Sequence, residues 1–352
     1  MGTGLGQGRS APDDLRIVVV GCGGGGCNSI TRLSRIGIKN AELLAVNTDV
    51  VSLRSTPIKG RLLIGDDFTK GLGTGGDPEV GESCAINASG ALNQILQDAD
   101  LVFIIASLGG GTGTGAAPVI AECAQRNGAV VIGIVTVPFR HEGARRRNAA
   151  IMGMRRLREV SNTMLIMEND RLSDLVDNLP VNQAFGVMDQ LISDLIASLV
   201  SAISEPSLVN VDFADLRTVL RQGGVSTILY AENADPDAVV EDAVSNPLLD
   251  VDIKGGTGAL IHLSAGRALT LRKANKIVQG ITQHLDNDAT VKMGVRVDEE
   301  RGDIIRLIAI VTGIAEMDMG DYALQGAEIK GRVSYLRPVR NADAVSSPPR
   351  RQ

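Results

Sequence analysis

Aromatic residues are scarce in this chain of 352 residues, which has no tryptophan, three tyrosines and five phenylalanines. So few rings disfavour the stacking surface on which proteins that bind single-stranded nucleic acid depend. The formal net charge of −6 also argues against a general nucleic-acid binder, which needs a basic surface. We therefore expect no nucleic-acid partner.

Cysteine and histidine are scarce as well. The three histidines are scattered along the chain. The four cysteines are Cys22, Cys27, Cys84 and Cys123, and they show neither the spacing of zinc ligands nor the density of a secreted disulfide scaffold. We expect buried free thiols and no metal centre made by the protein alone.

Long apolar runs are also missing. None approaches the ~18 residues that a membrane span needs. Residues 1–14 lack the apolar core of a signal peptide. The sequence thus predicts a cytoplasmic protein with no membrane span.

Glycine, by contrast, is abundant, with 41 residues. The segment Gly109-Gly110-Gly111-Thr112-Gly113-Thr114-Gly115 follows a predicted buried strand at 101–106 and precedes a predicted helix at 116–127, with Pro118 in its first turn. Backbone N–H groups of such a turn approach anions closely, and the helix N-terminus and threonine hydroxyls favour anions too. The segment predicts a phosphate site. It is not a P-loop, because no lysine follows the last glycine.

A second glycine-rich turn, at residues 21–26, follows the first predicted strand and satisfies G-x-G-x-x-G. Asp49 lies 23 residues beyond Gly26, which completes a dinucleotide-binding fingerprint. A nicotinamide-dependent oxidoreductase is therefore one interpretation, but it leaves residues 109–115 unexplained. Two glycine-rich turns at one edge of a sheet can instead hold several phosphates between them.

Strands and helices alternate through the first half of the chain. Such alternation predicts an α/β fold with a mostly parallel sheet covered on both faces. The predicted strands are 16–20, 43–46, 101–106, 129–137 and 164–167, and the predicted helices are 28–36, 79–97, 116–127 and 144–160.

The second half of the chain has a different pattern. Residues 182–204 carry apolar side chains at helical spacing and suit a long connecting helix. A helix at 215–221 and strands at 227–230, 258–264, 290–297 and 304–312, with two further helices between them, predict an α+β domain with a mixed sheet.

Together these motifs resemble the FtsZ family of tubulin-like cell-division GTPases, its archaeal members in particular. The tubulin-family signature is matched by residues 109–115 with Ala116-Ala117-Pro118. Further motifs match at residues 21–28, 47–49, 71–79, 137–139 with Glu142, Gly143 and Arg146, 169–170, Phe185 with Asp189, and 210–215. The likeness covers about residues 15–314.

The resemblance implies a parallel, Rossmann-like GTP-binding sheet joined by a long central helix to an α+β domain with a mixed sheet. The implied parts are a disordered arm (1–14), a GTP-binding domain (15–181), the central helix and connector (182–209), an activation domain (210–331) and a basic flexible tail (332–352). Two features depart from the family pattern, the short basic tail and residues 226–234, which replace a glycine-containing segment. GTP or GDP with Mg²⁺ is the implied cofactor, and the activity is GTP hydrolysis activated by polymerisation.

The expected nucleotide-binding residues come from all of these loops. They are Gly24, Gly25, Gly26, Cys27, Asn28, Asp49, Gly75, Gly76, Gly110, Gly111, Thr112, Gly113, Thr114, Gly115, Pro138, Glu142, Arg146, Asn169, Phe185 and Asp189. Asp189 is suited to accept hydrogen bonds from the ring N–H and amino group of guanine, which adenine lacks. Phe185 either packs on the base or belongs to the core.

The expected catalytic residues are Asn210, Asp212 and Asp215. Asp212 and Asp215 share one face where a helix begins, although Asp212 can equally be a plain N-cap. The family resemblance gives both aspartates a role in polarising the attacking water. A helix of about 23 residues, about 35 Å long, separates them from the phosphate loops, so they are expected to act on the next subunit of a head-to-tail filament.

The implied partners are further copies of the chain and membrane-tethering division proteins, at the midcell division site. A tubulin-like cell-shape protein and a regulatory paralogue with weak polymerisation remain alternatives.

Overall fold

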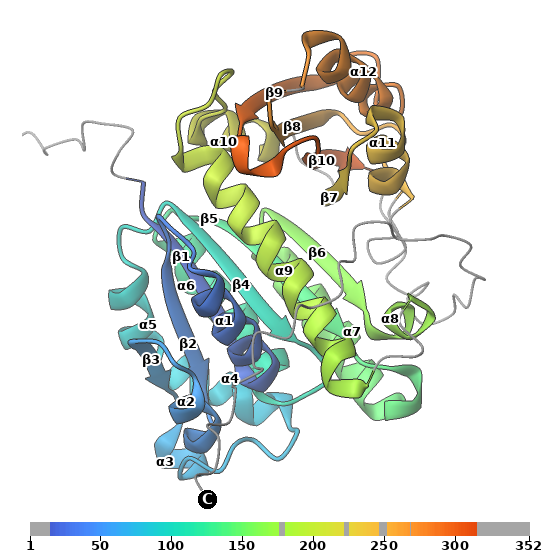
Figure 1. The fold of residues 1–352 in the computed structure, drawn as a ribbon. Coiled ribbons are helices and arrows are strands. Elements are labelled where there is room, and N and C mark those ends of the chain that lie inside the picture. The colour runs from blue at the N-terminus through green and yellow to red at the C-terminus, as the bar shows by residue number, and fades with distance from the viewer. Residues whose placement is uncertain (1–14, 176–179, 222–224, 246–251, 268, 315–352) are drawn as a thin grey trace, which may run out of the picture.

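The structure is a computed structural model that describes residues 15–175, 180–221, 225–245, 252–267 and 269–314. Two sheets are joined by one long helix that runs through the middle of the molecule (Figure 1). The expected N-terminal arm (1–14) and basic tail (332–352) lie outside the described residues.

The first sheet has six parallel strands in the order β3-β2-β1-β4-β5-β6. Its strands are β1 (Ile17–Cys22), β2 (Glu42–Asn47), β3 (Gly60–Leu63), β4 (Leu101–Ser107), β5 (Val130–Val137) and β6 (Thr163–Glu168). The central strands are apolar throughout because both faces are covered, and every residue of β1 and β5 is buried. This confirms the predicted parallel sheet.

Helices pack on both faces of the first sheet. One face packs against α1 and α9, and the other against α4 to α7. The helices of this half are α1 (Gly23–Ile36), α2 (Val50–Ser55), α3 (Asp66–Thr69), α4 (Pro78–Asn87), α5 (Ser89–Leu96), α6 (Thr112–Arg126), α7 (Ala144–Glu159) and α8 (Asn169–Leu175), with a 3₁₀ turn, η2 (Arg140–Glu142), before α7.

Some boundaries differ from the predictions. Helix α6 begins at Thr112 rather than at 116, so Pro118 lies in its second turn and not its first. Helix α1 likewise begins within the glycine run, at Gly23. Close packing overrides the low helix propensity of glycine here, since a Cβ on Gly26 would lie 2.4 Å from the carbonyl oxygen of Ile105. The short strand β3 was not predicted.

The second sheet has the order β7-β10-β8-β9. Strand β10 runs antiparallel to β7 and β8, whereas β8 and β9 are parallel, so the predicted mixed sheet is confirmed. Helices α11 and α12 cover one face of this sheet. Its elements are α10 (Phe213–Leu220), β7 (Val225–Asn233), α11 (Pro236–Val244), β8 (Gly258–Ala265), α12 (Leu271–Thr282), β9 (Thr290–Val297), η3 (Glu299–Arg301) and β10 (Ile305–Ile314).

The long helix α9 (Val181–Ser204) connects the two halves. Its apolar side chains join one continuous core with strands of both sheets, for example Leu195 with Phe103 of β4 and Ile308 of β10. By length and composition, the stretch Gln183–Ser204 would suffice to cross a membrane, but most of it is buried inside the protein. Helix α9 is therefore a core helix that both sheets share.

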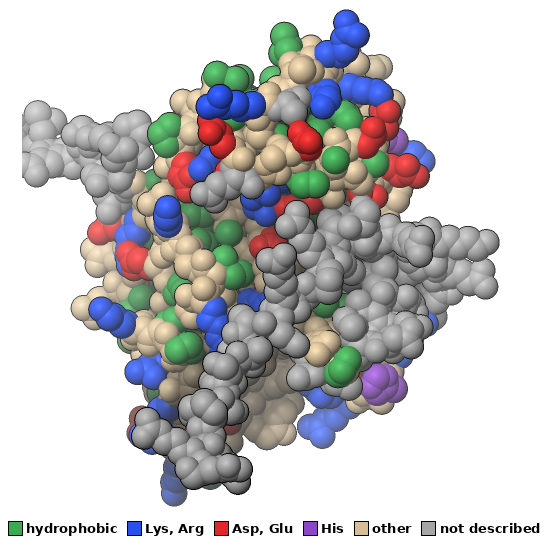
Figure 2. Space-filling model, in the orientation of Figure 1, with side chains coloured by type: hydrophobic (Ala, Val, Ile, Leu, Met, Phe, Trp, Pro, Cys, Tyr) green, Lys and Arg blue, Asp and Glu red, His purple; other side chains and the backbone are tan. Residues whose placement is uncertain are grey.

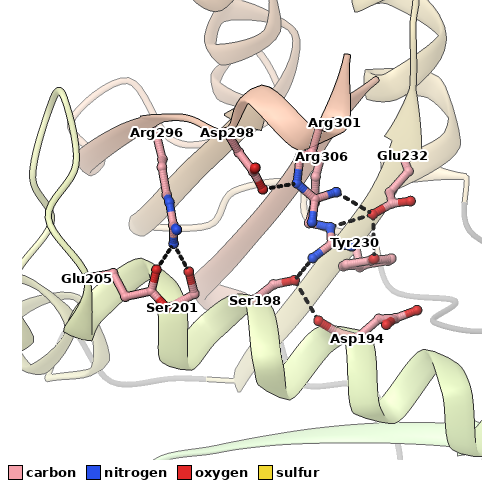
Figure 3. A network of polar contacts seen from close by, with 10 residues as sticks. All are labelled: Asp194, Ser198, Ser201, Glu205, Tyr230, Glu232, Arg296, Asp298, Arg301 and Arg306. Carbon is pink, nitrogen blue, oxygen red and sulfur yellow. Dashed lines mark hydrogen bonds and ion pairs between the residues drawn. The ribbon is translucent and has the colours of Figure 1, made fainter. Parts of the chain in front are cut away.

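A polar network also ties α9 to the second sheet (Figure 3). The Arg306 guanidinium donates to Ser198 Oγ of α9 at 2.7 Å and also pairs with Glu232. Arg301 pairs with Glu232 at 3.1 Å, and the Tyr230 hydroxyl donates to the same carboxylate at 3.1 Å. The two arginines keep the pKa of Glu232 below its usual range despite burial, which by itself acts in the opposite direction.

All four cysteines are free and buried, as predicted. Burial raises the pKa of Cys22 strongly and that of Cys27 to about 11. Cys22 ends β1 directly beneath the glycine-rich turns, and its thiol lies 3.6 Å from the carbonyl oxygen of Thr112.

Candidate functional site

The two glycine-rich turns meet at the carboxyl edge of the first sheet. They follow β1 and β4, which are adjacent and parallel, so both turns emerge at the same edge. A Cβ on Gly23 would lie 2.9 Å from the amide nitrogen of Gly113, and one on Gly25 would lie 2.0 Å from Ser107 Oγ. Glycine is thus required where the turns touch each other.

The helices that begin at these turns have N-termini without side-chain caps. Among the described residues, no side chain accepts a hydrogen bond at the N-cap of α1 or of α6. Asp49 caps α2, Asp77 caps α4 and Asp212 caps α10, whereas α3, α5, α7 and α9 have no side-chain cap either. The first-turn N–H groups of α1 and α6 are therefore available to an anion, and both helix dipoles favour negative charge there.

Open space faces the backbone of both turns. The φ angles of Gly24 and Gly110 lie outside the left-handed region, and a Cβ on either would meet no described atom within 4 Å. The packing of the chain itself thus gives no reason for glycine at these two positions. A ligand that approaches the backbone would give one. Gly75 and Gly76, in the loop before α4, also face open space, with positive φ angles of 63° and 81°.

Gly111 differs from its neighbour. A Cβ there would lie 1.9 Å from Thr74 Oγ1 and 2.7 Å from the carbonyl oxygen of Asp77. Gly111 is therefore needed for the contact between the loop before α4 and the start of α6, whatever else it does.

The threonines of the signature hold the turn together. Thr114 Oγ1 accepts a hydrogen bond from the Gly109 amide at 2.9 Å, and the hydroxyls of Thr112 and Thr48 lie 2.6 Å apart. Both signature threonines are buried. Thr48 lies in the matched motif at 47–49 but was not among the expected nucleotide-binding residues.

Three of the predicted nucleotide-binding residues, Asp49, Cys27 and Asn28, differ in their surroundings. The Asp49 carboxylate accepts from the amides of Val51 and Ser52, so it caps α2. Cys27 is buried and packs in a small apolar cluster beneath α1. Asn28 is exposed on the same helix.

The loop after β5 borders the glycine turn. A Cβ on Gly109 would lie 2.9 Å from the carbonyl oxygen of Arg146 and 3.0 Å from Pro138 Cγ. Glu142 accepts from the amide of Phe139 at 2.9 Å and pairs with Arg146. The structure thus brings Pro138, Glu142 and Arg146 together beside residues 109–114.

Asp189 and Phe185 lie one turn apart near the start of α9. Ser29 of α1 donates to Asp189 Oδ1 at 2.6 Å. Burial raises the pKa of Asp189, and the hydrogen bond from Ser29 and the charge of Arg32 oppose that rise. A partly buried, oriented carboxylate is suited to accept hydrogen bonds from a ligand.

The Phe185 side chain is 43% exposed and meets Phe139 edge to face at 5.9 Å between ring centroids. The interpretation of Phe185 as a core residue is therefore wrong. Asn169 begins α8, next to Asp170, whose carboxylate accepts from the Arg140 amide at 3.1 Å. Ser29 was a further residue that sequence reasoning missed, because nothing in the sequence pairs it with Asp189.

The three expected catalytic residues lie beyond the other end of α9. Asp212 is the N-cap of α10 and accepts from the Asp215 amide at 2.8 Å, while Asp215 accepts in turn from the Asp212 amide at 3.3 Å. Asn210 Oδ1 accepts from the Ser207 amide at 2.6 Å. Lys292 of β9 donates to Asp215 at 2.8 Å and, with the backbone hydrogen bond from Asp212, lowers the pKa of that carboxylate.

The structure therefore separates the predicted residues into two groups. Phe185 and Asp189 lie in the first turns of α9, which has 24 residues, and the group at 210–215 lies beyond its end; the helix from residue 189 to residue 204 alone is about 22 Å long. Figure 1 shows α10 in the upper part of the molecule, beside the end of α9, and α2 and α3 at the bottom. One chain thus presents the two halves of the predicted site at opposite ends.

Comparisons with known proteins agree with this architecture. Residues 16–177 match the family model described as Tubulin/FtsZ family, GTPase domain, and residues 224–315 match that described as FtsZ family, C-terminal domain. The chain is 48% identical to cell division protein FtsZ 2 of Methanocaldococcus jannaschii over 86% of its own length and 80% of that protein. It is 44% identical to cell division protein FtsZ 2 of Halobacterium salinarum over 86% of its own length and 77% of that protein.

A solved structure is similar as well. An empty FtsZ dimer from M. jannaschii superimposes with a TM-score of 0.79 at 40% identity, covering 85% of this chain and 88% of that one. The oxidoreductase interpretation is therefore wrong, because both halves of the chain match this family and its GTPase domain includes both glycine-rich turns. With two glycine-rich turns at one sheet edge, a second mixed sheet across a central helix and these matches over most of its length, the chain belongs to the FtsZ family of tubulin-like cell-division GTPases.

Proposed function

We propose that this GTPase polymerises head-to-tail, and that the carboxylates at 212 and 215 of one subunit complete the site around the nucleotide of the next. The observation that carries the proposal is the separation of the two halves, one near the start of α9 and the other beyond its end. An isolated subunit cannot bring Asp215 to the phosphates of its own nucleotide. A heterologous contact of this kind does not close on itself, so it generates a filament.

The phosphates are proposed to bind between the two glycine-rich turns. Support comes from the uncapped N-termini of α1 and α6 and from the open space in front of Gly24 and Gly110. The remaining glycines of these turns, with Gly75, Gly76 and the threonines at 112 and 114, would surround the phosphates. Among the predicted residues, Asp49 would act through the backbone of its loop, since its carboxylate caps α2.

The base is proposed to lie at the start of α9. Asp189 would accept the two guanine donors, Phe185 would pack on the ring, and Asn169 would add a polar contact. Support comes from the exposure of Phe185 beside a partly buried carboxylate oriented by Ser29. Glu142 would hold the ribose hydroxyls and Arg146 would offset phosphate charge.

Mg²⁺ is the proposed metal cofactor. It would neutralise the negative charge that develops during phosphoryl transfer. Within the described residues, no group of three or more His, Cys, Asp or Glu side chains is placed to hold a metal ion. This arrangement is compatible with a cation that is bound mainly by phosphate oxygens and water, with few ligands from side chains.

Exposed apolar side chains at both ends of the molecule support head-to-tail docking. The nucleotide end exposes Val51, Phe68 and Leu72 around α2 and α3, with 74, 60 and 84% exposure. The other end exposes Leu208 and Val209, at 77 and 40%, in the loop that carries Asn210. Burial of such patches against each other would supply the apolar centre that protein interfaces have.

We further propose a cytoplasmic protein that acts at the midcell division site with membrane-tethering division proteins as partners. No nucleic-acid partner is proposed, because the chain is acidic overall. Acidic and basic side chains also intermix over the second domain, at the top of the face seen in Figure 2.

Right-angle light scattering combined with phosphate release tests the proposal. GTP should produce both signals, whereas GDP and ATP should produce neither. Hydrolysis per molecule should rise with protein concentration, because a lone subunit has half a site. A concentration-independent rate, or equal hydrolysis of ATP, would overturn it.

A mixing experiment tests the shared site directly. Asp215→Ala should retain GTP binding but lose hydrolysis, and Gly110→Val should lose GTP binding. Mixed together, the two inactive variants should regain activity at junctions where a GTP-loaded Asp215→Ala subunit meets an intact aspartate pair. Mixtures no more active than their components would count against catalysis in trans, provided sedimentation shows that the two variants co-assemble.

A further inference from the structure

Strand β9 holds the loop that leads to the predicted catalytic aspartates. The loop begins where Arg296 pairs with Glu205 and donates to Ser201 at the end of α9 (Figure 3). In its middle, Val209 and Val295 exchange two backbone hydrogen bonds of 3.1 and 3.0 Å. Where the loop ends, Lys292 pairs with Asp215 at 2.8 Å. Three contacts from one edge strand therefore position the whole segment 205–215.

Packing between the polar contacts is close. A Cβ on Gly294 would lie 2.7 Å from Val211 Cγ2 and 2.8 Å from His262 Cδ2. Val211 is only 4% exposed. The backbone of the loop is thus fixed against β9. The Asp215 carboxylate is partly exposed, so its orientation depends on a side-chain partner.

We propose that Lys292 is a positioning residue for GTP hydrolysis, holding the Asp215 carboxylate in place and charged as the neighbouring subunit's nucleotide docks. This inference rests on the proposed function in trans. The charged groups that face Asp215 are Lys292 from β9 and Asp212 from its own helix. A docking triphosphate adds negative charge to a pair of carboxylates, which favours protonation of one of them. The ammonium of Lys292 opposes this effect and is anchored to a different element.

The variant Lys292→Met tests the proposal in the full-length protein. It keeps the length of the side chain and removes the charge. We expect kcat for GTP to fall on the order of tenfold at pH 7, less than the ~100-fold that a 1 Å misplacement of a reacting group can cost. The KM for GTP should not change, because the nucleotide loops lie at the other end of the chain. Rates are to be compared at equal polymer mass, measured by sedimentation.

Two further variants control the result. Lys292→Arg keeps a positive donor within reach of Asp215 and should restore most of kcat. Lys276→Met removes another lysine–aspartate pair of the same domain, that between α12 and Asp237 of α11, and should leave kcat unchanged. A general loss of stability or of surface charge would affect Lys276→Met in the same way as Lys292→Met.

Titration of the Asp215 carboxyl carbon by NMR gives an independent readout. Its pKa should rise in Lys292→Met and return in Lys292→Arg. An unchanged kcat and an unchanged pKa in Lys292→Met would overturn the inference. If Lys292→Met retains full kcat while Asp215→Ala is inactive, only the inference fails; if Asp215→Ala itself hydrolyses GTP normally, the proposed function fails with it.

Discussion

Gly110→Ala separates the needs of the ligand from the needs of the fold. A Cβ at this position would meet no described atom within 4 Å, and its φ is not in the left-handed region. The folded chain therefore tolerates alanine, and the loss of glycine's freedom in the unfolded state should raise stability by about 0.4–1 kcal/mol. If phosphate oxygens approach the backbone here, the methyl group will weaken that contact.

The size of the binding defect follows from the contact that is lost. A hydrogen bond between a backbone N–H and a charged group contributes about 1.5–3 kcal/mol, which corresponds to roughly a 10- to 150-fold rise in the Kd for GTP. Calorimetry on nucleotide-free protein gives the Kd. Thermal unfolding must also use nucleotide-free protein, because bound GTP itself raises the melting temperature.

Two matched glycines complete the experiment. Gly90→Ala on α5 also adds a Cβ that meets no described atom within 4 Å, and it should raise stability without any change in Kd. Gly111→Ala should lower stability, because its Cβ would lie 1.9 Å from Thr74 Oγ1. A Gly110→Ala protein with unchanged Kd, or one that melts below the parent, would refute the reasoning.

Three other predictions concern polar groups that are buried or partly buried. Asp189→Ala should lower the preference for GTP over ATP in competition binding more than it lowers affinity for inorganic triphosphate, because the carboxylate is proposed to contact the base; equal losses would contradict this. Burial lowers the pKa of His262 from 6.5 to about 4 in the folded chain, so the unfolded chain binds the additional proton between these values and stability falls as the pH falls through that window. The loss between pH 7 and pH 5 should be about 2 kcal/mol by urea unfolding, and His262→Asn should lack it; an identical loss in the variant would exclude His262 as its source. Arg306→Met should destabilise by about 2 kcal/mol, less than the loss of a fully buried pair, because the partly buried Glu232 carboxylate loses one of its two arginine partners. The double variant with Glu232→Gln should recover part of that loss, and a strictly additive result would show that the two groups are not coupled.

Elements with long apolar runs could be predicted from the sequence. Strands β1, β4 and β5 are apolar because both faces of the sheet are covered, and α9 shows a helical apolar stripe over its length. Strand β3 could not be found in this way, because it has four residues, one of them glycine and another arginine, and its place at the sheet edge leaves it only partly buried.

Contacts between distant residues were beyond sequence reasoning. The pairing of Ser29 with Asp189 joins positions 160 residues apart, and no local pattern indicates it. The same is true of Lys292 with Asp215, which depends on the parallel pairing of β8 with β9 and on the course of the loop before α10. The glycine motifs were informative because their chemistry is local, but the start of α6 at Thr112 depends on packing against residues 74–77.

The burial of all four cysteines makes the chain suitable for site-specific labelling. Thiolates are the reactive species, and the raised pKa of each buried thiol keeps it protonated. A cysteine introduced at an exposed position, such as 152 on α7, would then be the fast-reacting thiol on a folded molecule. Slow alkylation of Cys22, at the base of the glycine-rich turns, would in turn report how often that part of the fold opens.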